Sequence, residues 1–513
     1  MLCGSNSTRR RRPPRVVTWT AALVAAVTLA GLGSPGTGGA APAADRTPPP
    51  GPAPTIAWTP CPADPTARCG TLSVPVDWDR PAGPRFDLAL ARRTAADPAA
   101  RVGTLVFGPG GPGDSGVGRI VTGMSRFSAE LRRRFDIVSF DPRGVGASNP
   151  VRCSTELLGQ RPAPVLTSQA DFDATVAYNR RLWADCRRHT GPVFDHVDTL
   201  STVRDLEAIR AALGEPRLTF HGSSYGTLLG AQYAEKFPHR IRAMVLESVV
   251  DHSLETRAFL DTQTATAQDS FDEFVAWCDR TESCALHGRD VRAVWADLLA
   301  RAGRGELPDP ADPARNLTPY VLSAERAHRA FKGPDWAEFA RTLRALHAGG
   351  PDTPAAPVGN AEPEPTAPNE LAIFCQDWSL PIRDHREYAG LLRRMARTGP
   401  DVRYPRALAV VESCLGTPVP VANPQHRLDV ETDRPLLLIN SRHDPAGGYE
   451  WATNVARQLG RHGVLLSYDG AGHGSYNSGP CMTGAVDRYL VSLTLPARGA
   501  TCPAVEPAPD DAG

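Results

Sequence analysis

The chain has 513 residues, of which 41% are hydrophobic, and its 56 basic and 56 acidic residues cancel to a formal net charge of zero. This length is enough for more than one domain and for a large buried core. Because the charge is balanced, the sequence indicates neither a nucleic-acid-binding surface nor an acidic solvating tail, and we expect no nucleic-acid partner.

The first 43 residues are organised as a secretory signal peptide. Arginines at 9–12 and 15 precede the apolar stretch VVTWTAALVAAVTLAGL (16–32), and the small residues A-P-A (41–43) provide a cleavage site. A membrane anchor is the competing interpretation, but the stretch is at or below the ~17–25 residues that a spanning helix needs. We therefore expect cleavage near Ala43, by the general or the twin-arginine route, and a secreted protein without stable membrane insertion.

The cysteines agree with export. Of eleven, Cys3 lies in the signal segment, which leaves an even number, as is typical of a disulfide-bonded exported chain. Metal ligation is the alternative, but no C-x-x-C or His-rich spacing supports it, so we expect no metal and no cofactor. Because the remaining cysteines occur as sequence neighbours, we predict the following pairs: Cys61–Cys69, Cys153–Cys186, Cys278–Cys284, Cys375–Cys414 and Cys481–Cys502.

Strand patterns dominate the first half of the mature chain. After a Pro-rich linker, short alternating stretches at 69–79 and 85–93 predict antiparallel edge strands. Apolar strands that run into loops or helices follow at 102–116, 135–148, 217–238 and 241–250. Strands that alternate with helices indicate a mainly parallel α/β sheet.

The periodicity becomes helical between residues 252 and 430, and strand patterns resume at 434–444 and 463–474. A helical block inserted into an α/β domain is the layout of a cap or lid over a sheet. The predicted organisation is the following: signal peptide 1–43, first part of the α/β core 44–251, helical cap 252–430, and C-terminal part of the core 431–513.

A serine motif lies where one predicted strand turns into a helix. Gly222-Ser223-Ser224-Tyr225-Gly226 matches G-x-S-x-G with Ser224 at its centre. This chemistry needs a tight turn that lifts one hydroxyl above the sheet edge, and the flanking glycines allow the close backbone approach. We predict that Ser224 is a nucleophile and that Ser223 only makes local hydrogen bonds.

A serine nucleophile needs a base and an orienting carboxylate, which in this type of fold follow in the order Ser, Asp or Glu, His. Asp444 ends one late strand and His473 follows the next, so we predict these two residues as the partners of Ser224. Rival residues are less suitable. They are His221 before the motif, His443 beside Asp444, and Asp469, which we interpret as a turn residue.

The transition state also requires donors for its oxyanion. One is the backbone N–H of Tyr225, directly after the nucleophile, and the second comes from the loop GPGGPG (108–113). Because the prolines of this loop have no N–H, Gly110 and Gly111 remain, and we favour Gly111. We expect Asp141 and Arg143, in DPRGVGAS, to brace the neighbouring loop.

Taken together, these motifs resemble the secreted tripeptidyl aminopeptidases of actinobacteria. The resemblance is carried by GPGGPGDSG, FDPRGVGAS, GSSYGTLLGAQYAEKFPHRIRAMVLESVVD, HDPAG and GHGSY, and it covers residues 56–503. It implies an α/β-hydrolase fold of the prolyl-aminopeptidase clan with a TAP-like C-terminal region and the triad Ser224, Asp444 and His473. The glycine loop opens with Gly108-Pro109 instead of Asn-Pro, and the acid loop also departs from the D-P-V-T-P of relatives.

By this resemblance, the expected substrates are peptides or proteins with a free N-terminus, from which tripeptides or other short peptides are released. A carboxylate should then receive the substrate ammonium; the candidates are Glu247, Asp251, Glu370 and Asp377, and the sequence does not select one. A secreted esterase or lipase with the same triad is the alternative enzyme, and a non-catalytic peptide- or wall-binding relative is the third possibility. The sequence does not determine the oligomeric state, and a monomer is compatible with it.

Overall fold

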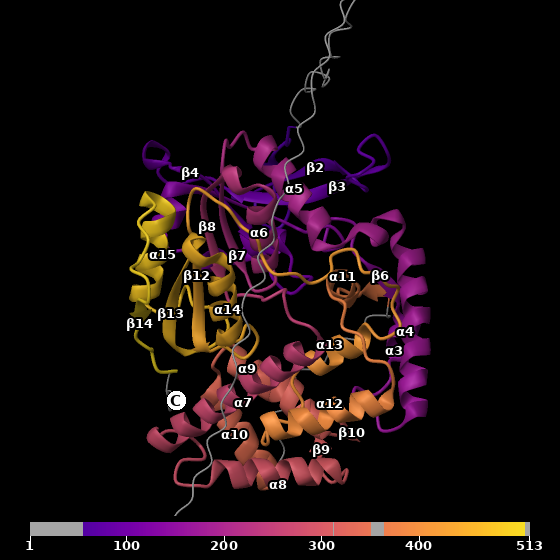
Figure 1. The fold of residues 1–513 in the computed structure, drawn as a ribbon. Helices are drawn as coiled ribbons and strands as arrows, with labels where there is room; N and C mark the ends of the chain where they lie inside the picture. The colour runs from indigo at the N-terminus through magenta and orange to yellow at the C-terminus, as the bar shows by residue number, and fades with distance from the viewer. Residues whose placement is uncertain (1–54, 311, 350–363, 508–513) are drawn as a thin grey trace, which may run out of the picture. The chain divides into compact units, whose positions relative to one another are not determined.

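The computed structural model describes residues 55–310, 312–349 and 364–507 (Figure 1), so the predicted signal peptide lies outside the described residues. Within these residues, one ten-stranded sheet has the strand order β1-β2-β3-β5-β4-β7-β8-β12-β13-β14. Its strands are β1 Thr59–Pro60, β2 Arg68–Pro75, β3 Arg85–Arg93, β4 Gly103–Gly108, β5 Phe135–Phe140, β7 Leu218–Ser223, β8 Ile241–Glu247, β12 Leu436–His443, β13 Gly463–Ala471 and β14 Thr501–Cys502.

The strand directions confirm the α/β prediction. β2 and β3 pair antiparallel at one side of the sheet, and β3 also pairs antiparallel with β5. From β5 through β4, β7, β8, β12 and β13 to β14, all neighbours are parallel. The carboxyl ends of these parallel strands therefore meet at one edge of the sheet, where ligands of open α/β sheets bind.

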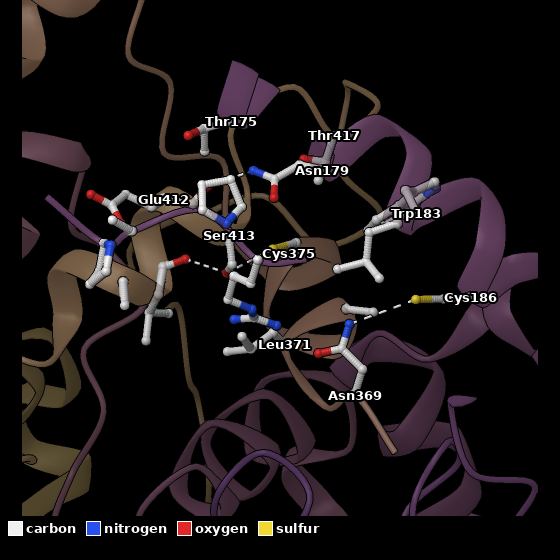
Figure 2. A pocket seen from close by; sticks show the side chains of 18 of the residues that line it. Thr175, Asn179, Trp183, Cys186, Asn369, Leu371, Cys375, Glu412, Ser413 and Thr417 are labelled. Atoms are coloured by element: carbon white, nitrogen blue, oxygen red, sulfur yellow. Dashed lines mark hydrogen bonds between the residues drawn. The ribbon is translucent and has the colours of Figure 1, made fainter. Parts of the chain in front are cut away.

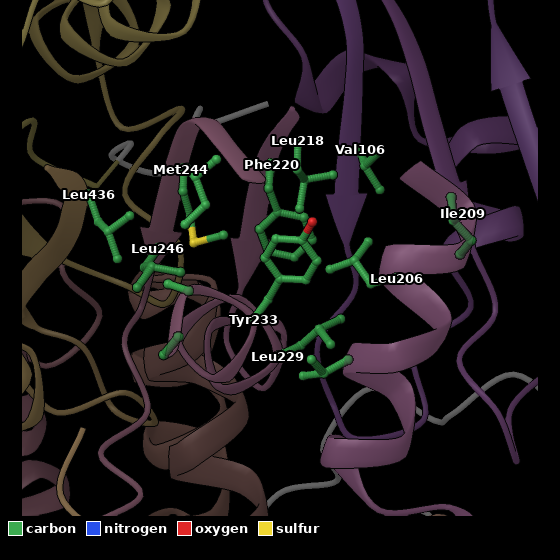
Figure 3. Packing of buried hydrophobic residues seen from close by; sticks show 14 of the residues in the cluster. Val106, Leu206, Ile209, Leu218, Phe220, Leu229, Tyr233, Met244, Leu246 and Leu436 are labelled. Atoms are coloured by element: carbon green, nitrogen blue, oxygen red, sulfur yellow. The ribbon is translucent and has the colours of Figure 1, made fainter. Parts of the chain in front are cut away.

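Helices cover both faces of the sheet through two buried apolar clusters. Leu206 of α5 and Tyr233 of α6 pack in the first cluster (Figure 3). Val455 of α14 also belongs to it. Ile120 of α1 and Met482 of α15 belong to the second. The helices outside the predicted cap segment are α1 Gly116–Thr122, α2 Ala129–Arg134, α3 Thr155–Gly159, α4 Gln169–Thr190, α5 Thr199–Ala212, α6 Gly226–Lys236, α14 Tyr449–Leu459 and α15 Pro480–Ser492. The short 3-10 turns there are η1 Pro98–Ala100, η2 Met124–Arg126, η3 Pro192–His196, η4 Pro238–Arg240 and η6 Gly460–His462.

The segment predicted as a helical cap is mainly helical. Its helices are α7 Thr256–Arg280, α8 Val291–Gly303, the π-helical turn η5 Val321–Ala327, α9 His328–Lys332, α10 Trp336–His347, α11 Leu371–Asp377, α12 His385–Thr398 and α13 Ala407–Ser413. It also contains strands that the helical periodicity did not predict, the hairpin β9 Pro308–Asp309 and β10 Asp312–Asn316. A third strand, β11 Thr366–Pro368, pairs with β6 Arg152–Ser154, which lies more than two hundred residues earlier in the chain.

All of the predicted disulfides are present. In the described part of the chain the bonded pairs are Cys61–Cys69, Cys153–Cys186, Cys278–Cys284, Cys375–Cys414 and Cys481–Cys502. Such a set is typical of proteins that fold in an oxidising compartment. None of the described helices is both long and apolar enough to cross a membrane.

Candidate active site

The serine motif forms a strained turn between β7 and α6. Ser224 has φ of 55°, a left-handed conformation that is rare for a residue with a side chain and is characteristic of nucleophile elbows. A Cβ on Gly222 would lie 2.3 Å from the Gly226 carbonyl oxygen, so only glycine permits this closeness. The Ser224 N–H donates a 2.8 Å hydrogen bond to the carbonyl oxygen of Glu247, which anchors the turn to the end of β8.

The adjacent serine has a different environment. The Ser223 hydroxyl accepts a 3.0 Å hydrogen bond from the Arg126 guanidinium. This contact is the local hydrogen-bonding role that the sequence predicted for Ser223. The hydroxyl of Ser224 makes no hydrogen bond with any described residue.

Asp444 and His473 are brought together as the strand order predicted. His473 Nδ1 lies 2.8 Å from Asp444 Oδ1, and Asp444 is only 1% exposed. The backbone N–H groups of Ala446 and Gly447 each donate a 2.9 Å hydrogen bond to the same carboxylate oxygen, so the acid is fixed after β12. When Nδ1–H donates to the carboxylate, Nε2 is left to accept a proton, as a general base requires.

The rival residues have other partners. His443 Nδ1 is 2.9 Å from the Asp269 carboxylate, and Asp469 accepts a 2.7 Å hydrogen bond from Arg442. His221 is buried within β7 and pairs with Glu247. None of the three contacts Asp444 or His473 by a hydrogen bond among the described residues.

The loop that carries His473 returns to the end of β8, where Ser224 is anchored. The Gly474 N–H donates a 2.9 Å hydrogen bond to Ser248 Oγ, and the Tyr476 N–H donates one of the same length to Glu247 Oε1. Glu247 thus contacts both sides of the candidate site, the serine turn through its carbonyl and the histidine loop through its carboxylate. No direct Ser224–His473 hydrogen bond is present in the described structure.

Glu247 is a buried anion with two cationic or ionisable neighbours. Its carboxylate contacts Arg126 and lies 2.9 Å from His221 Nε2. Burial by itself would raise the pKa of Glu247, but Arg126 and His221 hold it well below its usual range. A charge that is desolvated and paired in this way is a rigid attachment point and is not available to a substrate ammonium.

The glycine loop lies directly against Ser224. A Cβ on Gly110 would be 2.9 Å from Ser224 Cβ, whereas Gly111, at φ of 104°, faces Gly113 and Asp114 of its own loop. The residue packed on the serine is therefore Gly110, and the choice of Gly111 as the donor stays a prediction. Across the elbow, Tyr225 immediately precedes α6, and its N–H belongs to the positive end of that helix.

Asp141 and Arg143 hold the loop after β5, as expected. Asp141 accepts hydrogen bonds from the Ser115 hydroxyl and from the Ala147 N–H, at 2.6 and 2.8 Å. Arg143 is fully buried and makes two 2.7 Å hydrogen bonds to the Asp205 carboxylate. Such a bidentate contact stabilises the loop and leaves no free charge for chemistry.

The predicted cap segment contacts the loop that carries His473 directly. The His473 backbone N–H donates a 2.8 Å hydrogen bond to the carbonyl of Lys332 at the end of α9. On the same helix, burial, followed by the charges of Arg406 and His473, lowers the pKa of His328 to about 3. His328 is thus an uncharged neighbour of His473.

A buried network behind Tyr225 was not anticipated from the sequence. The Tyr225 phenol donates a 2.6 Å hydrogen bond to Asp377 of α11, which also accepts from the Thr199 hydroxyl at 2.6 Å and from Asn423 at 2.8 Å. Burial, assisted by the charge of Asp198, raises the pKa of Asp377 to about 7. No sequence signal indicates this contact, because its members come from four distant segments.

The four acids considered for the substrate ammonium differ sharply. Glu247 and Asp377 are buried and engaged. Asp251 is buried as well and accepts hydrogen bonds from Ser253 and Gln458. The Glu370 carboxylate has no hydrogen bond or ion pair with the described residues, and its side chain is half-buried.

Glu370 also lies beside the glycine loop, since a Cβ on Gly113 would be 2.1 Å from Glu370 Cγ. In the described part of the chain, no three His, Cys, Asp or Glu side chains are grouped so that they could hold a metal ion.

Comparison with known proteins identifies the relatives of this chain. A family model described as TAP-like protein matches residues 403–502. The serine protease Hip1 of Mycobacterium tuberculosis (strain ATCC 25618 / H37Rv) is 31% identical over 480 residues, covering 87% of this chain and 91% of that protein. The tripeptidyl aminopeptidase of Streptomyces lividans is 32% identical over 478 residues, covering 87% of this chain and 86% of that protein.

A third relative carries a different name. Carboxylesterase B of the same Mycobacterium tuberculosis strain is 31% identical over 467 residues, covering 85% of this chain and 86% of that protein.

The peptidase relatives match at equal or higher identity, the TAP-like model covers the acid and histidine loops, and the sheet has the expected order. The chain is therefore an enzyme of the α/β-hydrolase fold and belongs to the serine peptidase family of the tripeptidyl aminopeptidases.

Proposed function

We propose that the protein is an exported aminopeptidase that releases short peptides, with tripeptides as the expected product, from free N-termini. The observation that carries the proposal is the Asp444–His473 pair. The loop that carries His473 is hydrogen-bonded to Glu247 at the end of β8, where Ser224 is also anchored. Export is supported by the five disulfides of the described residues and by the signal-like segment 1–43.

In the proposed reaction, Ser224 Oγ attacks the carbonyl carbon of the scissile peptide bond while His473 takes the hydroxyl proton. Asp444 orients the imidazole and stabilises the imidazolium. The developing oxyanion would accept hydrogen bonds from the Tyr225 N–H and from the glycine loop at Gly110 or Gly111. As the C–N bond breaks, His473 gives its proton to the departing amine, and water then hydrolyses the acyl-enzyme to the free peptide.

Glu370 is our candidate for the group that receives the substrate ammonium. Of the four acids, it is the one without a hydrogen bond or ion pair in the described structure, and it borders the glycine loop. A carboxylate at a fixed distance from Ser224 would set the length of the released peptide. The ammonium would bind this carboxylate while the scissile carbonyl lies at Ser224, so only a fixed number of residues fits between them.

The alternative is a carboxylic-ester hydrolase, because the same acyl-transfer groups do not specify the leaving group. One observation favours keeping it, the similarity to a protein named carboxylesterase B. Kinetics on tripeptidyl anilides, their N-acetylated forms and p-nitrophenyl esters distinguish the two functions. We expect cleavage of the free-amine anilides and strong loss on acetylation; ester turnover without any peptide cleavage would reject the aminopeptidase.

Mass spectrometry of the products from an unblocked peptide of mixed sequence measures the product length directly. Release of tripeptides from the amino end is expected. Release from the carboxyl end, or internal cuts, would contradict the proposal.

A further inference from the structure

A recess lies among α4, η5, α11 and α13, and none of the candidate catalytic residues lines it. Its volume is about 320 Å³, and Figure 2 shows Asn179 of α4 and Asn369 before α11 at opposite sides of it, with Cys375 and Ser413 between them. Two disulfides border the recess, since Cys186 and Cys375 are among its lining residues. The recess is therefore held by covalent links on two sides.

The charges of the recess do not balance. Arg161 and Arg406 line it, both are exposed, and neither forms an ion pair with a carboxylate in the described residues. Burial raises the pKa of Tyr320, and the positive charges of Arg161 and Arg406 counteract this rise. Both guanidiniums therefore lie near the Tyr320 phenol, which also lines the recess.

The acids of the lining compensate only part of this charge. Glu325 is one. Glu412 is the other, and burial raises its pKa to about 8, so it is mostly uncharged near neutral pH while its carboxyl contacts the Tyr388 phenol. At neutral pH the lining thus presents two positive groups against one negative group.

The remaining lining suits a peptide. Leu182, Trp183 and Val410 supply apolar surface. Asn179 Nδ2 donates to the carbonyls of Glu412 and Leu415, whereas no described residue donates a hydrogen bond to its Oδ1, which is left for a ligand N–H.

Two sets of residues connect the recess to the candidate active site. Asn369 and Leu371, which line it, flank Glu370, and Glu370 contacts the glycine loop. Arg406 also lines a smaller cavity together with His328 and Pro445, the residue after Asp444.

We propose that this recess binds a carboxylate of a peptide, through Arg161 and Arg406, and so gives the enzyme a preference for peptides that present a side-chain or C-terminal carboxylate there. A planar guanidinium recognises a carboxylate by paired hydrogen bonds, which a neutral amide cannot reproduce. As a statement about substrates, this inference rests on the proposed aminopeptidase function.

The test measures binding without turnover. Titration calorimetry on the full chain carrying Ser224→Ala uses free-amine hexapeptides with one Glu or one Gln at each position in turn, and each peptide is made with a C-terminal acid and a C-terminal amide. At one position, or at the C-terminus, we expect the carboxylate form to bind about tenfold more tightly than its amide, a discrimination typical of one charge-assisted contact. The position identifies whether a side chain or the terminus supplies the carboxylate.

Arg161→Gln and Arg406→Gln, added separately, should each reduce this discrimination at least threefold. The matched control is Arg181→Gln, on an exposed arginine of α4 outside the recess, and it should leave the discrimination unchanged. Equal binding of acid and amide peptides by the Ser224→Ala protein, or a discrimination that survives both arginine substitutions, would overturn the inference. If the wild-type enzyme fails to cleave free-amine peptides but the arginine-dependent discrimination is found, only the proposed function fails.

Discussion

The phenol of Tyr225 donates a 2.6 Å hydrogen bond to Asp377 of α11, so the residue after the candidate nucleophile is attached by its side chain to the predicted cap segment. Its backbone N–H is the expected oxyanion donor, and a donor stabilises a transition state only when its direction is fixed before the reaction. Asp377 is buried, and one of its carboxylate oxygens accepts hydrogen bonds from both hydroxyls, that of Tyr225 and, at 2.6 Å, that of Thr199.

Tyr225→Phe should therefore reduce kcat about tenfold with little change in KM, less than the 10²–10³ lost with an oxyanion donor itself. The matched control is Thr199→Val, which also removes one hydroxyl donor from Asp377 and should cost about 1–3 kcal/mol of stability. Steady-state kinetics and thermal unfolding of both variants separate the roles. Equal kcat losses in both would mean that Asp377 acts through general stability and does not position Tyr225.

Replacement of the central serine tests the nucleophile. Ser224→Ala should lower kcat by roughly 10⁶, as the loss of a serine nucleophile does elsewhere, without lowering the unfolding temperature. Ser223→Ala is the control, because that hydroxyl contacts Arg126 and should retain most activity. Fluorophosphonate labelling and peptide mapping should place the adduct on Ser224; an adduct on Ser223 would reverse the assignment.

The acid of the site is tested by Asp444→Asn, which keeps the shape but removes the charge that orients the imidazole. We expect kcat to fall about 10⁴-fold. Asp469→Asn, which affects the exposed contact with Arg442, should change kcat by less than threefold. A comparable loss in both variants would remove the reason for choosing Asp444.

Glu370→Gln should raise KM for free-amine peptides roughly 10- to 100-fold, the range expected when one hydrogen bond to a charged group is lost. Turnover of N-acetylated or ester substrates should not change, since they carry no ammonium. Glu364→Gln, earlier in the same segment and paired with Arg152, is the control. If Glu370→Gln leaves the free-amine KM unaltered, another group binds the ammonium.

The free energy of unfolding should depend on pH through Glu412. Its pKa is raised by burial from 4.5 to about 8 in the folded protein, so the unfolded state releases the proton first as pH rises. The wild-type protein should therefore lose stability between about pH 4.5 and pH 8, by up to about 1.4 kcal/mol per pH unit from this group.

Glu412→Gln removes that titration and should become more stable relative to wild type as pH rises through this window. Thermal unfolding at pH 5 and pH 8 measures the difference. An unchanged difference between the two pH values would show that the folded-state pKa is not raised.

Local patterns were sufficient for much of this protein. The G-x-S-x-G motif between an apolar strand and a helix predicted the turn at Ser224, and the order of strand-ending residues predicted the Asp444–His473 pair. The disulfides followed from neighbouring cysteines, because short loops close at low entropic cost. These features depend on residues that are close in sequence or on the repeated plan of a parallel sheet.

Other features were decided only by tertiary structure. The Tyr225–Asp377 hydrogen bond and the β6–β11 pairing join segments more than a hundred residues apart, and no periodicity indicates them. The sequence left four acids equivalent, whereas burial and pairing in the folded chain occupy Glu247, Asp251 and Asp377 and leave Glu370 beside the glycine loop. The sequence by itself determined the types of chemical groups and the strand ends that carry them; the packing of distant segments decided which charges are buried, neutralised or left to meet a substrate.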